Sequence, residues 1–136
     1  MKTGISNKIS IMFLLLAIGM ILFFTFQNPY SSYELSMSIR NWLSDYGLNI
    51  EYRSLRTNAH IVEYFILGLA MALFVKNRGW NTIIAVMAGC MCGVLDEMVK
   101  ILLPGREFGT GDLVRDFIGV GLAVVMIEFF YKIDFM

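Results

Sequence analysis

Residues Ile9–Phe26 read ISIMFLLLAIGMILFFTF, a stretch without a charged side chain. A helix that crosses the hydrocarbon core of a bilayer needs roughly 20 mostly apolar residues. The stretch therefore predicts a first membrane-spanning helix. Lys2 and Lys8 come before it, as in a secretory signal peptide, but Thr25–Pro29 after it contain no small-x-small cleavage site. We therefore expect the helix to be retained.

Three further segments come close to the same length and hydropathy, at residues 60–75, 82–103 and 113–131. Together with residues 9–26 they predict an all-α fold: an integral membrane bundle of four transmembrane helices, in a single domain of residues 1–136. The composition agrees with this prediction. Of the 136 residues, 57% are hydrophobic and 16% are charged, which is too little polar surface for a soluble domain.

A more polar segment separates the first two predicted spans. Ser31 and Glu34 form an S-x-x-E capping box after Pro29, and Gly47 provides a stop signal. Between these signals, apolar residues recur at helical spacing: Leu35, Ile39, Trp42, Leu43 and Tyr46. The pattern predicts a short extracytoplasmic amphipathic helix that lies along the membrane interface. The alternative is an ordinary loop helix that packs on the bundle.

The short basic loop at residues 76–81 sets the expected orientation. The positive-inside rule places this loop in the cytoplasm, with Lys76 and Arg78, and both termini follow it there. We therefore expect a multi-pass protein of the cell membrane with the segment Tyr30–Ala59 outside. The formal net charge of zero gives no electrostatic reason to expect a nucleic-acid partner.

Ionisable residues gather at the outer ends of three predicted spans. They are His60 and Glu63 in the second span, Asp96, Glu97 and Lys100 in the third, and Asp112, Arg115 and Asp116 in the fourth. Small residues such as Gly68, Gly93 and Gly119 continue the same helical faces inward, and small residues let membrane helices approach closely. We therefore expect the polar ends to face one another. Ionised groups in a bilayer usually mark function, although outer-end charges in the headgroup layer are the alternative.

The segment between the third and fourth spans carries turn signals and a further cation. Pro104 and Gly105 end the third helix, and Phe108–Gly111 form a glycine-rich loop whose backbone amides could bind an anion. The loop lacks the G-K-[ST] ending of a phosphate-binding P-loop. We expect Asp112 to be a helix N-cap.

Arg106 is expected to form an ion pair. A carboxylate near the hydrocarbon boundary needs such a partner to stay ionised at low cost. We therefore predict that Arg106 pairs with at least one of Asp96, Glu97, Asp112 and Asp116.

These residues resemble the VanZ-like family of small integral membrane proteins. The resemblance covers residues 56–123 and rests on four pieces in order. They are R-x-x-A-H-x-x-E-Y from Arg56 to Tyr64, D-E at Asp96 and Glu97, P-G-R ending at Arg106, and D-x-x-x-D-x-x-G from Asp112 to Gly119. The resemblance implies a four-helix membrane protein of the cell envelope, in a family named for glycopeptide resistance, particularly to teicoplanin.

The sequence departs from the family pattern at three positions. Lys100 replaces a common Gln, Thr57 replaces a common Lys, and Glu107 replaces a common Ser. Because Lys100 is a departure, we expect Lys100→Gln to be tolerated better than Arg106→Ala.

The favoured function is binding at an extracytoplasmic polar pocket. The predicted ligand is a membrane lipid, a lipid-linked cell-wall intermediate or a lipoglycopeptide, with Lys100 and Arg106 meeting its anionic groups. The predicted binding residues are His60, Glu63, Tyr64, Asp96, Glu97, Lys100, Arg106, Asp112 and Asp116.

Two other functions stay open. In an intramembrane enzyme, His60, Glu63, Asp96 and Glu97 would supply acid and base groups or hold a divalent metal. The sequence contains neither a nucleophile elbow nor a complete metal motif, so we expect no cofactor and no metal. A proton or ion pathway is the weaker alternative, because the inner halves of the spans contain no polar relay.

Overall fold

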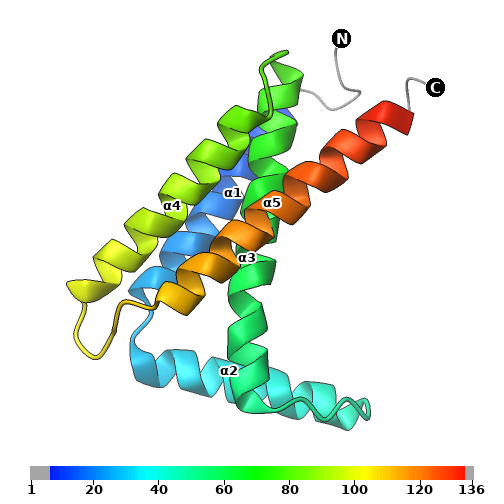
Figure 1. Cartoon of the computed structure of the whole chain (residues 1–136). Coiled ribbons are helices and arrows are strands. Elements are labelled where there is room, and N and C mark those ends of the chain that lie inside the picture. Colours follow the sequence, from blue (N-terminus) through cyan, green and yellow to red (C-terminus); the bar gives the residue numbers. More distant parts are fainter. Residues whose placement is uncertain (1–6, 134–136) are drawn as a thin grey trace.

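The computed structural model describes residues 7–133, and its first helix is α1 (Asn7–Phe26). Within these residues the fold is all-α, with five helices and no strand. As Figure 1 shows, α1, α3 (Tyr52–Asn77), α4 (Ile83–Ile101) and α5 (Thr110–Ile133) run lengthwise against one another. Helix α2 (Pro29–Asp45) lies across one end of this bundle. The predicted all-α class is therefore confirmed.

Two of the helices, α1 and α3, are long and apolar enough to cross a membrane. Helices α4 and α5 have 19 and 24 residues, but each carries ionisable residues within its apolar stretch. The spans expected at 82–103 and 113–131 therefore stay predictions. Lys2, which supported the expected orientation, lies outside the described residues.

Helix α2 begins differently from the prediction. The side chain of Asn28, and not that of Ser31, caps it: Asn28 Oδ1 accepts the Ser31 N–H at 2.8 Å. The predicted capping box is therefore wrong, because Pro29 already occupies the first turn and places Ser31 inside the helix. The predicted stop is confirmed, since Gly47 has φ +81°.

No residue of α2 is buried. Several of its apolar side chains are exposed, with Trp42 at 59% and Ile39 at 42%, whereas Leu43 is half-buried. The position of this helix along the membrane interface stays a prediction.

Glycines bring α3 and α5 into backbone contact, and this is the most extensive helix pair in the fold. A Cβ on Gly119 would lie 2.5 Å from the Ile61 carbonyl oxygen. A Cβ on Gly68 would lie 2.8 Å from Ala123 Cβ. Only hydrogen fits at these two positions, so the small-residue faces predicted for these helices lie at their interface.

Helix α4 joins the same interface through its own glycines. A Cβ on Gly89 would lie 2.8 Å from the Val120 side chain, and a Cβ on Gly93 would lie 3.3 Å from Asp116 Cβ. The buried residues of α4 also include Asp96, Glu97 and Lys100. The polar end of α4 is thus turned toward α5, as predicted.

The antiparallel order of α3, α4 and α5 places their ionisable residues at one end. The start of α3, the end of α4 and the start of α5 all lie at the end where α2 crosses, while the loop between α3 and α4 lies at the other (Figure 1). The predicted gathering of the ionisable residues is confirmed for the described part of the chain.

We predict that Gly119→Ala lowers the free energy of unfolding by about 2 kcal/mol or more, because the new methyl group meets the α3 backbone. Gly121→Ala is the matched control on the same helix, since its Cβ would have no neighbour within 4 Å. The control should be neutral or stabilising, by up to about 1 kcal/mol. Thermal unfolding in detergent measures both, and equal effects would contradict this packing.

Candidate functional site

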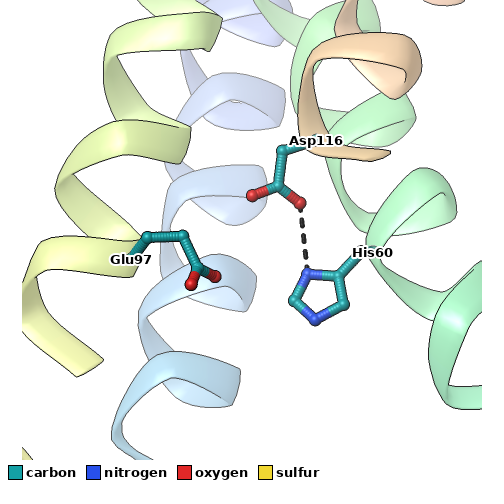
Figure 2. Close-up of side chains that lie close together, drawn as sticks. All are labelled: His60, Glu97 and Asp116. Atoms are coloured by element: carbon teal, nitrogen blue, oxygen red, sulfur yellow. Dashed lines mark hydrogen bonds and ion pairs between the residues drawn. The ribbon is translucent and has the colours of Figure 1, made fainter. Parts of the chain in front are cut away.

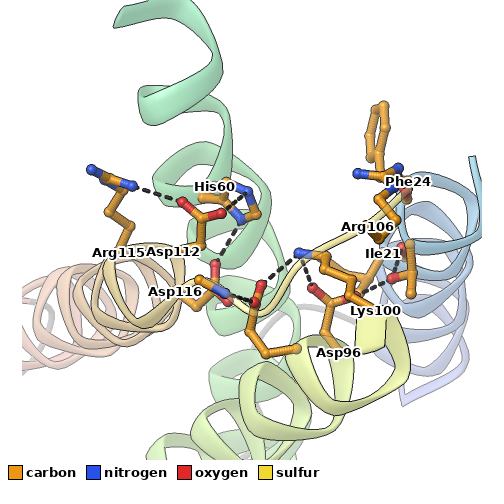
Figure 3. A network of polar contacts seen from close by, with 12 residues as sticks. Ile21, Phe24, His60, Asp96, Lys100, Arg106, Asp112, Arg115 and Asp116 are labelled. Carbon is orange, nitrogen blue, oxygen red and sulfur yellow. Dashed lines mark hydrogen bonds and ion pairs between the residues drawn. The ribbon is translucent and has the colours of Figure 1, made fainter. Parts of the chain in front are cut away.

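His60 connects α3 to the first turns of α5. Its Nδ1 lies 3.1 Å from Asp116 Oδ1, and its Nε2 lies 3.5 Å from Asp112 Oδ2. Asp112 also accepts a hydrogen bond from Arg115 Nη1 at 2.7 Å. Asp116 is fully buried, and its Oδ2 has no hydrogen-bond partner. Figure 3 shows these contacts as one continuous group.

Lys100 is the shared partner of two carboxylates on its own helix. Its Nζ lies 2.8 Å from Asp96 Oδ2 and 2.6 Å from Glu97 Oε1. All three side chains are buried. The hydroxyl of Thr25 on α1 is hydrogen-bonded to the other Asp96 oxygen, so this group also reaches the first helix (Figure 3).

The loop before α5 binds a carboxylate of the chain itself. The Gly109 N–H donates to Glu97 Oε2 at 2.8 Å. The glycine-rich loop therefore holds Glu97 with the amide that we expected to bind an external anion. The predicted N-cap role of Asp112 is wrong, because α5 begins at Thr110 and Asp112 lies in its first turn.

Arg106 contacts backbone carbonyls and no carboxylate. Its Nη2 donates to the carbonyl oxygens of Phe24 at 3.1 Å and Gln27 at 2.5 Å. Within residues 7–133 it forms no ion pair, so the predicted pairing of Arg106 is wrong. The reason is physical: Lys100 already pairs with Asp96, and the last carbonyls of α1 lack helical partners and carry partial negative charge.

The remaining predicted residues lie beside this network. Glu63 is half-buried and makes no hydrogen bond or ion pair within the described residues. Tyr64 is buried, and its hydroxyl has no hydrogen-bond partner. All nine predicted binding residues therefore lie at one end of the bundle, in or next to one network.

A cavity of about 410 Å³ opens next to the network, between α1, α2 and the start of α3. One part of its lining is apolar, with side chains such as Phe24, Leu35 and Ile66. The other part is ionisable and consists of Arg56, His60, Glu63, Asp96, Lys100 and Arg106. An amphiphilic ligand matches such a lining.

Sequence reasoning missed four participants. Thr25 had a detectable signal, as a hydroxyl near the outer end of an otherwise apolar span. Arg56 belonged to the resemblance but was not predicted to bind. Nothing in the sequence could have identified the Phe24 and Gln27 carbonyls, because any residue supplies one.

The comparison with known families covers this whole region. The model of the VanZ/LLP1 family matches residues 10–131. The chain belongs to the VanZ/LLP1 family. Neither a curated protein nor a solved structure matches the chain significantly. Membership supports a VanZ-like envelope protein, and α1 and α3 add support for a membrane location.

This VanZ/LLP1 protein also brings three metal-ligand types together from three helices. His60, Glu97 and Asp116 offer ligand atoms that all lie within 4.8 Å of one another. Figure 2 shows the three side chains pointing toward one another. Nitrogen and carboxylate oxygen are ligands that zinc and related divalent ions accept.

The structure changes the expectation for Lys100. Because the ammonium group is buried against two carboxylates, Lys100→Gln leaves both without a cation. Removing one partner of a buried ion pair typically costs about 3–5 kcal/mol. We now predict a loss of this size, measured by thermal unfolding in detergent. Lys132→Gln on exposed surface is the control and should change stability by less than about 0.5 kcal/mol. Equal stability of the two variants would contradict the buried pair.

Proposed function

We infer that this VanZ/LLP1 protein binds an anionic lipid headgroup in the cavity between α1, α2 and α3. The ligand classes are a membrane phospholipid and a lipid-linked cell-wall intermediate, which share a phosphate next to hydrocarbon. The observation that carries the proposal is the combination, in one cavity, of an apolar wall with Arg56 and Arg106.

The two guanidinium groups favour an anion between them. Arg106 has no carboxylate partner in the described residues, and its Nε is buried without a hydrogen-bond partner. Burial lowers the pKa of Arg106, and like-charge repulsion from Arg56 lowers it further, although the group stays charged at neutral pH. A phosphate would remove the repulsion and accept the unused N–H, because arginine binds phosphate through paired donors.

The apolar part of the cavity suits the hydrocarbon part of such a ligand. Met20, Ile21 and Phe24 line it from α1, and Leu35 and Ile39 line it from α2. If α2 lies in the membrane interface, the cavity opens at the depth of the phospholipid headgroups. A lipoglycopeptide antibiotic has the same amphiphilic character and is a third ligand to test.

We propose four membrane spans, formed by α1, α3, α4 and α5 in one domain, with both termini in the cytoplasm. Charged side chains lower the hydropathy of α4 and α5, but they are either buried in the bundle or lie at its ends. They therefore need not face the lipid, which supports four spans. The cavity then faces outward, and the loop with Lys76 and Arg78 faces inward, as the positive-inside rule favours.

Cysteine labelling tests this orientation. In a chain whose free cysteines, Cys90 and Cys92, are replaced by serine, Ser54→Cys should react with an impermeant reagent in intact cells. Trp80→Cys, on the opposite loop and 51% exposed, should react only after the cells are permeabilised. The reverse labelling pattern would overturn the orientation.

Arg56→Gln tests the lipid site without disturbing the fold. Arg56 is exposed, and among the described residues it donates a hydrogen bond to the Tyr52 hydroxyl at 3.2 Å. We predict that Arg56→Gln weakens binding of phosphatidylglycerol by about tenfold or more, the loss of one charged hydrogen bond, at unchanged melting temperature. Native mass spectrometry in detergent measures the lipid-bound fraction.

The matched control is Arg53→Gln, an exposed arginine of the same helix that does not line the cavity. It should bind phosphatidylglycerol as the original protein does. Phosphatidylcholine, which has no net charge, should bind weakly to all three proteins. An Arg56→Gln variant that binds as tightly as Arg53→Gln would refute the headgroup site.

A metal-dependent enzyme is the second candidate, favoured by the meeting of His60, Glu97 and Asp116. With these three side chains as metal ligands and Asp96 paired with Lys100, Glu63 is the remaining acid or base group that lines the cavity. Chemical change of a bound lipid during incubation, stopped by His60→Gln, would favour the enzyme. An unchanged lipid would favour the binding protein.

A further inference from the structure

We propose that His60, Glu97 and Asp116 hold a divalent metal ion where α3, α4 and α5 meet. The inference stands on this geometry and does not depend on the proposed lipid site. It also differs from the enzyme alternative of the sequence analysis, in which a metal would be held without Asp116. Figure 2 shows the three side chains directed toward a common space.

The spacing of the ligand atoms suits one ion. All three lie within 4.8 Å of one another, and His60 Nδ1 is 3.1 Å from Asp116 Oδ1. Two ligand atoms on a tetrahedral zinc ion, each bonded at about 2.1 Å, lie roughly 3.4 Å apart. The nearer pair is already close to this spacing, and a metal ion there would replace the hydrogen bond between these two atoms.

The buried carboxylates outnumber the buried ammonium groups. Among the described residues, the buried side chains of Asp, Glu, Lys and Arg are Asp96, Glu97, Asp116 and Lys100, which are three carboxylates against one ammonium. Buried charges are normally paired or coordinated to metal. A divalent ion carries the charge that this group lacks when all three carboxylates are ionised.

An unused oxygen supports the site independently. Asp116 is 0% exposed, and its Oδ2 has no hydrogen-bond partner. The Tyr64 hydroxyl, one turn after His60 on the same face of α3, is also buried without a partner. Such groups are costly in a protein interior unless a ligand satisfies them.

Neighbouring groups hold the three ligands in place. Metal-binding histidines usually donate their second ring N–H to a carboxylate, and here Asp112 lies 3.5 Å from His60 Nε2. Glu97 is held by Gly109 N–H and by Lys100, and its oxygens keep further lone pairs for a metal. Asp112 is therefore a positioning residue for this site.

The expected ion is zinc or manganese, because one imidazole and two carboxylates suit both. Three protein ligands leave at least one coordination position open. His60 also lines the cavity, so the ion would lie next to any headgroup bound there.

Isothermal titration of the full chain in detergent, after dialysis against EDTA, tests the site with Zn²⁺ and, separately, with Mn²⁺. We expect saturable one-to-one binding of at least one ion and a higher melting temperature in its presence. His60→Gln and Asp116→Asn should each weaken binding about 100-fold, and Asp112→Asn about tenfold. Glu128→Gln removes a carboxylate at the opposite end of α5 and should leave the affinity unchanged.

If neither Zn²⁺ nor Mn²⁺ binds the original protein in a saturable way, the proposal is wrong. This outcome does not depend on the folding of any variant. Equal binding by the original protein and by a folded His60→Gln variant would also overturn it, since the ion would then bind elsewhere. In either case phosphatidylglycerol binding by the original protein, measured without metal, decides separately whether the proposed lipid site stands.

Discussion

The burial of unequal charge at one end of the bundle is the constraint on which the rest of this structure depends. Three carboxylates, on Asp96, Glu97 and Asp116, lie in the interior with the single ammonium of Lys100. Each isolated buried charge would cost several kcal/mol, so donors from several elements are placed against these acids. This explains why Thr25, Gly109 and His60, from separate parts of the chain, converge on these acids.

Close packing makes this convergence possible. Gly119 lets the α5 backbone touch α3 at Ile61, one residue after His60, and Gly93 lets α4 approach Asp116. The cavity with Arg56 lies beside these contacts, between α1, α2 and the start of α3. The packed interior contains the carboxylates of the network. The cavity beside it is lined by the guanidinium groups of Arg56 and Arg106 and by apolar side chains. The two proposed ligands, a metal ion and an anionic lipid, would therefore bind at neighbouring places with opposite charge requirements.

Helical periodicity predicted the five helices, their small-residue faces and the single end at which the acids gather, but α3 begins at Tyr52, eight residues before the predicted span at 60–75. The same periodicity places Lys100 at the i,i+4 position from Asp96 and at the i,i+3 position from Glu97. These two ion pairs could therefore have been predicted from the sequence. Two errors are local and concern the helix caps predicted at Ser31 and Asp112. The others concern tertiary partners. Arg106 binds carbonyls at the end of α1, and the Gly109 amide binds Glu97. A carbonyl or amide has no sequence signature, so only the fold could identify these partners.

The central claim is that side chains from different helices form one network, and the contact between His60 and Asp116 joins residues 56 positions apart. A double-mutant cycle of His60→Gln and Asp116→Asn, with unfolding measured in detergent, tests this contact most directly. The account predicts a coupling free energy of about 1 kcal/mol or more, since the groups are buried and hydrogen-bonded. Additivity of the two substitutions within about 0.3 kcal/mol would contradict it, because residues that do not meet behave independently.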